Sequence, residues 1–184
     1  MSLLGFCEWL ARSEWSIALH ESLYLYPLVE TTHVLALLLF VGTVSFVDLR
    51  LLGWVFRDVK VSEVTARLLP WTVAGFAISV VTGSLLFYAI PVRTYQSLFF
   101  RIKVVMLLAA GVNAALFRRA TRGGALAWDR DPTPPLRARV AGAVSLVAWM
   151  TVIVMGRMIA YDWFDCDRQP QPGFVNWAAG CIPP

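Results

Sequence analysis

The chain has 184 residues, of which 58% are hydrophobic and 15% are charged, and its formal net charge is +4. Soluble domains normally carry about 25% charged residues, so this composition excludes an ordinary soluble domain. Six of the sixteen Lys and Arg residues lie between Arg118 and Arg139, in a loop between apolar runs. Such clustering is typical of a cytoplasmic membrane loop, so we expect a lipid bilayer and no nucleic acid as partner.

The N-terminal region, residues 1–26, precedes the first long apolar run. Charged residues separate large apolar side chains that recur there at roughly helical spacing: Leu3, Leu4, Phe6, Trp9, Leu10 and Ile17. This pattern predicts an amphipathic helix that lies on the outer surface of the membrane. Pro27 follows, and because proline is tolerated in the first turn of a helix, it is expected to mark the turn into the first span.

Four apolar segments follow, each close to the roughly 20 residues that a membrane-spanning helix needs. The third is free of charge only from Val104 to Phe117, which is too short at ~1.5 Å per residue, so it must begin near Leu98 and include Arg101 and Lys103. The sequence predicts an all-α membrane protein, an antiparallel four-helix bundle forming one domain over residues 1–184. The predicted spans are 28–47, 71–90, 98–117 and 140–160.

Most of the basic residues lie in the two loops that follow the first and third segments. Short loops rich in Lys and Arg face the cytoplasm, so both termini are expected to face the periplasm of a bacterium. The chain is therefore predicted to be a multi-pass inner-membrane protein with a periplasmic tail over residues 161–184. The basic residues of the two loops are Arg50, Arg57, Lys60, Arg67, Arg118, Arg119, Arg122, Arg130, Arg137 and Arg139.

All three cysteines, Cys7, Cys166 and Cys181, fall in segments assigned to the periplasmic side. Disulfides persist in oxidising compartments, so this placement agrees with the predicted orientation. The tail is rich in proline and glycine, and a disulfide between Cys166 and Cys181 is expected to contribute roughly 3 kcal/mol by closing its loop. The alternative is two free thiols. In either case Cys7 has no predicted partner.

Ionisable residues gather near the periplasmic ends of three spans. Antiparallel threading places Glu30 and His33, early in the first span, beside Arg101 and Lys103 of the third and Arg157 of the fourth. Charges at membrane depth cost several kcal/mol, so such a layer is a candidate functional site. Glu30 and His33 share one helix face. Arg101 and Lys103 differ by about 200° around their helix, so only one can point inward, and Lys103 is the better candidate.

Haem b is the first chemical interpretation of this layer. His33 is a suitable axial ligand inside an apolar bundle, and Arg157 with Arg101 is expected to hold the haem propionates. His20 can supply the second ligand if the chain reverses between the two histidines, which would otherwise lie ~20 Å apart in one straight helix. Lys103, or His33 of a second copy in a dimer, is the alternative second ligand.

Two other interpretations remain open. Glu30 and His33 form one half of a di-iron carboxylate pattern, but its second half is missing, and copper prefers more His, Met or Cys ligands. In a purely structural role, Glu30 pairs with Lys103 or Arg157, and His33 bonds a neighbouring carbonyl group. The sequence has no nucleotide-binding loop, nucleophile elbow, CxxC or HExxH motif, so catalysis of the soluble-enzyme kinds is not supported.

Three stretches resemble a family of uncharacterised bacterial four-helix inner-membrane proteins, over nearly the whole chain. They are YPLVETTHVLALLLFVGTVSFVDLRLLG, PWTVAGFAISVVTGSLLF and FFRIKVVMLLAAGVNA. The most specific features are the histidine early in the first helix, DLRLLG at its end, TG in the second helix and F-x-x-K at the start of the third.

The layout is also similar, more distantly, to copper-resistance D-type membrane proteins and to the haem-containing membrane protoporphyrinogen oxidase. In the latter, a histidine of the first helix and a lysine of the third matter for haem, which implies such roles for His33 and Lys103. We therefore expect a haem b protein with its site near the periplasmic face, acting in electron transfer alone or as a small dimer. The alternatives are a cofactor-free subunit that anchors or stabilises a partner complex, and a membrane oxidase acting on a porphyrin or quinone.

Overall fold

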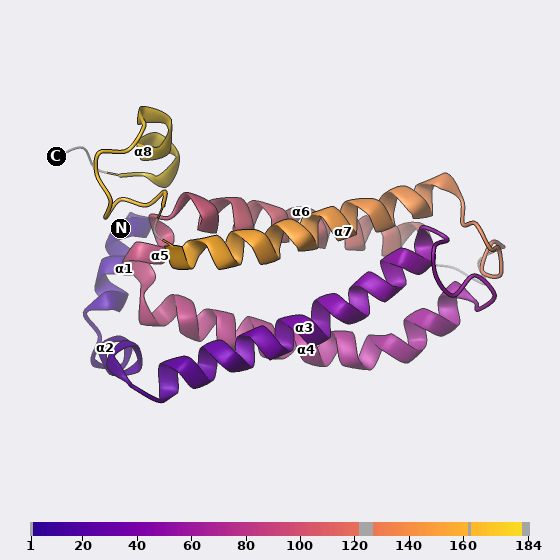
Figure 1. The fold of residues 1–184 in the computed structure, drawn as a ribbon, viewed down its shortest axis with the longest axis horizontal. Coiled ribbons are helices and arrows are strands. Elements are labelled where there is room, and N and C mark those ends of the chain that lie inside the picture. The colour runs from indigo at the N-terminus through magenta and orange to yellow at the C-terminus, as the bar shows by residue number, and fades with distance from the viewer. Residues whose placement is uncertain (1, 122–126, 162, 182–184) are drawn as a thin grey trace. The chain divides into compact units, whose positions relative to one another are not determined.

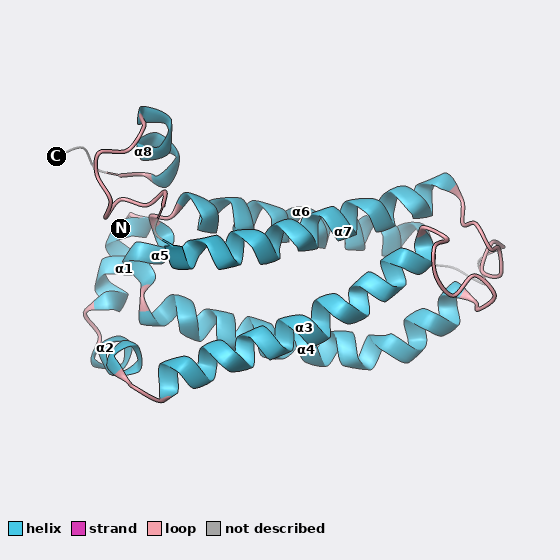
Figure 2. Ribbon diagram, in the orientation of Figure 1, coloured by secondary structure: helices cyan, strands magenta, loops and turns pink. Residues whose placement is uncertain are grey.

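The computed structural model describes residues 2–121, 127–161 and 163–181, so Arg122 lies outside the described residues. This part of the chain forms helices joined by loops, without strands (Figure 2). Within it, four helices are long and apolar enough to cross a membrane (Figure 1). The predicted all-α, four-helix membrane fold is confirmed. The four helices are α3 (Leu25–Leu51), α4 (Val61–Ala89), α6 (Leu98–Thr121) and α7 (Leu136–Met158).

The helices are longer than the predicted spans because they continue past the apolar segments that identified them. α4 begins at Val61 rather than near 71, and it contains Pro70 in its interior. α3 continues to Leu51, so Arg50, predicted to lie in a loop, belongs to its last turn. α7 continues into a short 3-10 helix, η1 (Ile159–Tyr161).

The chain divides into two compact units, each containing a part of every long helix. The terminal unit consists of Met1–Val34, Val80–Val105 and Val152–Pro184, and the loop unit consists of Leu35–Ser79 and Met106–Thr151. Successive long helices run in opposite directions. The terminal unit therefore contains the N-terminal parts of α3 and α6 together with the C-terminal parts of α4 and α7.

The N-terminal region of the terminal unit forms two helices, α1 (Leu3–Ala11) and α2 (Glu14–Glu21), where one was predicted. The break falls at Ser13, whose hydroxyl caps α2 by accepting from the Ser16 amide. Serine side chains favour this position because they satisfy an amide that has no partner inside the helix. The Ser13 and Ser16 hydroxyls also bond the hydroxyl and carbonyl of Tyr88, both at 2.7 Å. α2 is thereby attached to the end of α4, and Pro27 lies in the first turn of α3, as predicted.

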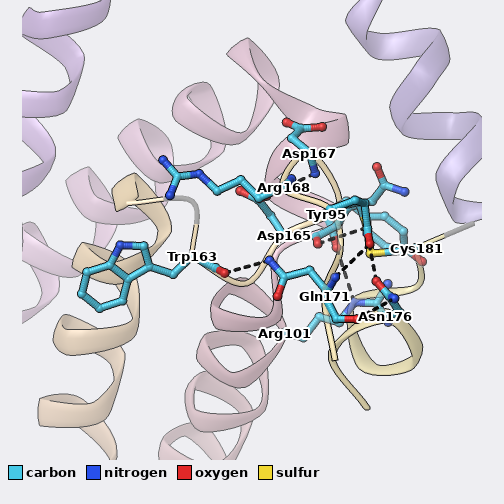
Figure 3. The surroundings of a disulfide bond; sticks show 12 residues. Tyr95, Arg101, Trp163, Asp165, Asp167, Arg168, Gln171, Asn176 and Cys181 are labelled. Atoms are coloured by element: carbon cyan, nitrogen blue, oxygen red, sulfur yellow. Dashed lines mark hydrogen bonds between the residues drawn. A yellow bond between two sulfur atoms is a disulfide. The ribbon is translucent and has the colours of Figure 1, made fainter. Parts of the chain in front are cut away.

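The tail contains the predicted disulfide, with the Cα atoms of Cys166 and Cys181 5.3 Å apart (Figure 3). It also forms a helix that the sequence did not predict, α8 (Gly173–Ala179). Gly180 ends α8 with a φ of 72°, a conformation that glycine adopts without strain. Residues 162 and 182–184 of the predicted tail lie outside the described residues.

Glycines allow the long helices of the loop unit to approach closely. A Cβ atom at Gly75 would lie 2.8 Å from the backbone nitrogen of Phe40, and one at Gly142 would lie 2.9 Å from the Asp48 carbonyl oxygen. Phe40 packs edge-on against Trp149, with 4.6 Å between ring centroids. Gly75 and Gly142 are therefore close-packing positions, as membrane helices commonly use small residues where their backbones meet.

Substituting Gly142 by alanine is expected to destabilise the protein, because the new methyl group meets backbone atoms that cannot turn away. Overpacking typically costs 1–3 kcal/mol, partly offset by the gain of about 1 kcal/mol in helix propensity. Gly111 on α6 is the matched control because no atom lies within 4 Å of its Cβ position, so Gly111→Ala should be neutral or stabilising. Thermal unfolding in detergent compares the two variants, and equal midpoints would contradict the packing role of Gly142.

The loop before α7 caps the start of α4 in the loop unit. The Asp129 carboxylate accepts from the Ser62 amide at 2.8 Å and from the Ser62 hydroxyl at 2.6 Å, and the Asp129 carbonyl accepts from the Val61 amide at 3.0 Å. Burial raises the pKa of this carboxyl, but the Ser62 bonds and the charges of Lys60 and Arg50 outweigh it, so the pKa lies below its usual value.

This lowered pKa predicts a loss of stability in acid. A carboxyl whose pKa is lower in the folded state stabilises the protein above its unfolded pKa of about 3.9, and the contribution disappears as the pH falls through the folded value. Asp129→Asn should therefore lower the thermal midpoint at about pH 6, and the difference from wild type should shrink below about pH 4. Asp131→Asn is the control, since that exposed residue contributes a backbone carbonyl to the loop. A deficit that persists unchanged in acid would contradict the role of the charge.

Candidate functional site

His33 lies on α3 in the terminal unit, with its ring against α4. Its Nδ1 is 2.9 Å from the hydroxyl oxygen of Thr82, which is buried. A Cβ atom at Gly83 would lie 3.1 Å from the His33 Cε1. Glycine at this position lets the imidazole lie close to the α4 backbone, and the neighbouring threonine fixes the direction of the ring.

Lys103 lies on α6 in the same unit, against α7. Its Nζ is 3.3 Å from the position of a Cβ atom at Gly156, and the side chain is partly buried. The two polar side chains thus follow one pattern, since His33 and Lys103 each lie against a glycine of another long helix. All four long helices contribute to this arrangement.

Arg101 and Arg157 lie in different surroundings from Lys103. The Arg101 guanidinium lies 5.0 Å from the ring centroid of Tyr95, and a Cβ atom at Gly180 would be 2.6 Å from its Nη2 (Figure 3). Arg101 is therefore directed to the tail and to α5 (Pro91–Tyr95), and Lys103 to α7, as their separation of about 200° predicts. Arg157 is exposed and lies 5.4 Å from the ring centroid of Tyr161.

Glu30 and His20 are exposed. Within the described chain, Glu30 forms no ion pair with Lys103 or Arg157, so the structural pairing considered from the sequence is not formed. The His20 ring contacts Tyr26 edge-on at 6.0 Å rather than His33, and it lines an open depression of about 270 Å³ together with Arg93. The structure therefore does not join the two histidines through a direct contact.

The hydrogen bond to Thr82 bears on which atom of His33 can bind a metal. When Nδ1 carries the proton and donates it to the threonine hydroxyl, Nε2 carries the lone pair that a metal requires. Among the described residues, no group of three or more His, Cys, Asp or Glu side chains is placed to hold a metal ion. A metal bound at His33 would therefore take its other ligands from outside these side chains, as haem iron does from its porphyrin.

Thr82 and Gly156 were not identified as site residues from the sequence. Thr82 and Gly83 form the TG pair noted in the second helix, but that observation does not link them to His33. Cys7, the remaining thiol, is free and buried in α1, and burial raises the pKa of its thiol. Its thiol is therefore not an activated nucleophile.

The profile of a family of unknown function, DUF6644, matches residues 20–162, a range that includes all four long helices and the residues around His33 and Lys103. The chain belongs to the DUF6644 family. No curated protein and no solved structure matches the chain. For this member of DUF6644, function must therefore be inferred from the site itself. The disulfide-bonded tail, from Cys166 to Cys181, lies beyond the matched range.

Proposed function

We propose that this protein binds haem b in the terminal unit, with His33 as an axial ligand, and transfers electrons. The observation that carries the proposal is the fixed imidazole, which bonds Thr82 through Nδ1 and rests on Gly83. Histidines that ligate metals almost always donate their other ring N–H to a neighbouring acceptor, which sets the tautomer and the ring orientation. Bound haem supplies an iron that exchanges one electron between its ferrous and ferric states.

Aromatic and cationic side chains of the terminal unit support this proposal. Phe87 of α4 and Phe100 of α6 stack at 5.5 Å between ring centroids and provide an apolar environment. Arg157, in the last turn of α7, is a cation that would pair with a carboxylate of the haem, whereas Arg101, the other predicted partner, is directed to the tail. In this scheme His33 would hold the iron, and Arg157 would help to orient the macrocycle.

Lys103 is the stronger candidate for the second axial ligand. It is partly buried on a long helix, whereas His20 is exposed and contacts Tyr26. The layout similarity to the haem-containing membrane protoporphyrinogen oxidase, which has a histidine on its first helix and a lysine on its third, supports the same pair. An oxidase activity on a porphyrin or quinone is not part of the proposal, since no described feature selects such a substrate.

We further propose that the chain lies in a bacterial inner membrane with both termini in the periplasm. The Cys166–Cys181 disulfide supports this orientation, because such bonds persist in oxidising compartments. The basic loops after α3 and α6 support it independently. The haem site then lies near the periplasmic face.

Thiol labelling tests the orientation. In a Cys7→Ser background, Cys166 and Cys181 should react with a membrane-impermeant maleimide at intact spheroplasts only after reduction. A cysteine introduced at the exposed Thr133, in the loop before α7, should react only after lysis. Labelling at position 133 in intact spheroplasts would contradict the proposed orientation.

The visible spectrum of the detergent-purified protein tests the haem proposal. Protein from cells that make haem should show a Soret band and sharp α and β bands on reduction with dithionite, and alkaline pyridine should give the b-type haemochrome. A colourless, monodisperse protein that takes up no added haemin overturns the proposal.

A colourless protein would favour the second function, a cofactor-free subunit that anchors a partner complex or forms a homodimer. One surface supports that function. Phe174 and Trp177 on α8 are 67% and 79% exposed and lie 6.1 Å apart between ring centroids. Phe174→Ser with Trp177→Ser should then release the partner or the second copy from the purified complex, while the wild-type chain retains it.

A further inference from the structure

Asp48 is a buried carboxyl in the loop unit that the proposed haem site does not use. It lies near the end of α3, its side chain is 5% exposed, and its Oδ2 has no hydrogen-bond partner within the described residues. Among the described residues, the polar side chain that acts on this carboxyl is Ser145 of α7. Gly142 brings the α7 backbone close to the Asp48 carbonyl, so the carboxyl lies where two helices meet.

Among the described residues, no cationic side chain forms an ion pair with this carboxyl. Residues 35–47, 68–79, 106–117 and 140–151 of the long helices contain no Asp, Glu, His, Lys or Arg. The other charged residues of these helices in the loop unit lie nearer the loops: Arg50, Glu63, Arg67, Arg118, Arg119, Arg137 and Arg139. The nearest cation in the sequence, Arg50, donates from Nε to the Val59 carbonyl at 2.9 Å and from Nη2 to the Asp131 carbonyl at 3.0 Å. The carboxylates that act on Arg50 belong to the loops: Asp58, Asp129 and Asp131.

A buried carboxylate without a cation is costly, and such groups become neutral or pair with a bound ion. A hard metal cation takes about six or more oxygen ligands. The polar side-chain groups identified at Asp48 among the described residues are its own carboxyl and the Ser145 hydroxyl, a small set for a metal and a sufficient one for a proton.

We propose that Asp48 is a proton-binding site in the loop unit. The carboxylate takes up one proton from water on the side of the loops and becomes a neutral carboxylic acid, and release returns the proton to water. Ser145 is the hydrogen-bond partner that positions the carboxyl. The site does not depend on haem, since its residues all belong to the other unit.

Infrared difference spectroscopy of the full-length protein in lipid nanodiscs tests this site. At about pH 6, exposed carboxyls with ordinary pKa values of about 3.9 to 4.3 are ionised. The wild-type protein should still show the C=O stretching band of a protonated carboxyl, which should disappear at higher pH and return on acidification. The band should be absent from Asp48→Asn and unchanged in Asp58→Asn, which alters an exposed loop carboxyl.

Ser145→Ala provides a second measurement, since loss of the hydroxyl should shift the frequency of the band and its titration midpoint. It keeps the proposal testable if Asp48→Asn does not fold. Identical spectra of the wild-type protein and Asp48→Asn, a band that never titrates, or a band that Ser145→Ala leaves unshifted would overturn the proposal. If the band disappears when sodium replaces choline in the buffer at constant pH, the site binds a metal cation, and the proposal of a proton site is overturned.

Discussion

Replacing His33 with alanine is expected to abolish the Soret band of the purified protein, while His20→Ala retains it. The difference follows from their surroundings, since His33 is fixed between α3 and α4 by Thr82 and Gly83, and His20 is exposed beside Tyr26. Without its axial ligand, haem is held only by apolar contacts and charge pairs. The absorbance ratio of the Soret band to the protein band in both purified variants measures the effect.

Rescue by imidazole separates a ligand from a structural histidine. His33→Gly leaves space beside Gly83, so added imidazole should restore the Soret band if the lost side chain was the ligand. A side chain that only joined α3 to α4 gives no such recovery. A His33→Ala protein that keeps the wild-type spectrum would contradict ligation by His33, whatever its stability.

Thr82→Val provides a finer test of the same site, because valine keeps the shape of threonine but removes the hydroxyl that bonds His33 Nδ1. Loss of such a supporting partner typically lowers metal affinity by about 10- to 100-fold. The haemin titration of the variant should weaken accordingly, with a displaced Soret maximum. Ser84→Ala is the control, since Ser84 bonds the Val80 carbonyl of its own helix. Equal affinities in the two variants would contradict the role of Thr82.

The long helices and the disulfide were predictable because each leaves a strong signal in the sequence. Uninterrupted apolar runs define α3, α4, α6 and α7, and the placement of Cys166 and Cys181 on one predicted side indicated their bond. The ends of the helices were less predictable. Charged residues after the apolar run of α3 indicated a loop, but a helix can continue past the apolar layer when its polar side chains find partners.

The site was predicted only in part. Helical spacing predicted that Lys103 and Arg101 lie on different faces of α6, because angular separation on a helix depends on sequence distance alone. The partners Thr82 and Gly156 depend on the rotation of α4 and α7 about their own axes, which apolar runs do not determine. The exposed position of Glu30 was not predictable for the same reason. The spacing of Glu30 and His33 places them on one face of α3, but it does not show which face packs against the other helices.

Replacing Arg50 with alanine is expected to produce the largest loss of stability among single changes in the loop unit. The side chain is 0% exposed, and its guanidinium bonds the Val59 and Asp131 carbonyls, which joins the loop after α3 to the loop before α7. Removing it breaks two charge-assisted bonds and leaves a cavity, at a combined cost of about 3–5 kcal/mol. That is a large fraction of the roughly 5–15 kcal/mol by which folded proteins are stable.

Arg50→Lys should recover less than half of this loss, although it keeps the charge. A guanidinium presents several donors in a fixed fork, and a lysine ammonium cannot match the geometry of Nε and Nη2 at two separate carbonyls. Arg57→Ala is the matched control, since the exposed Arg57 side chain donates to one carbonyl, that of Gly53 at 2.7 Å. Thermal unfolding in one detergent compares the variants. An Arg50→Ala midpoint equal to that of Arg57→Ala would show that the buried guanidinium does not hold the two loops together.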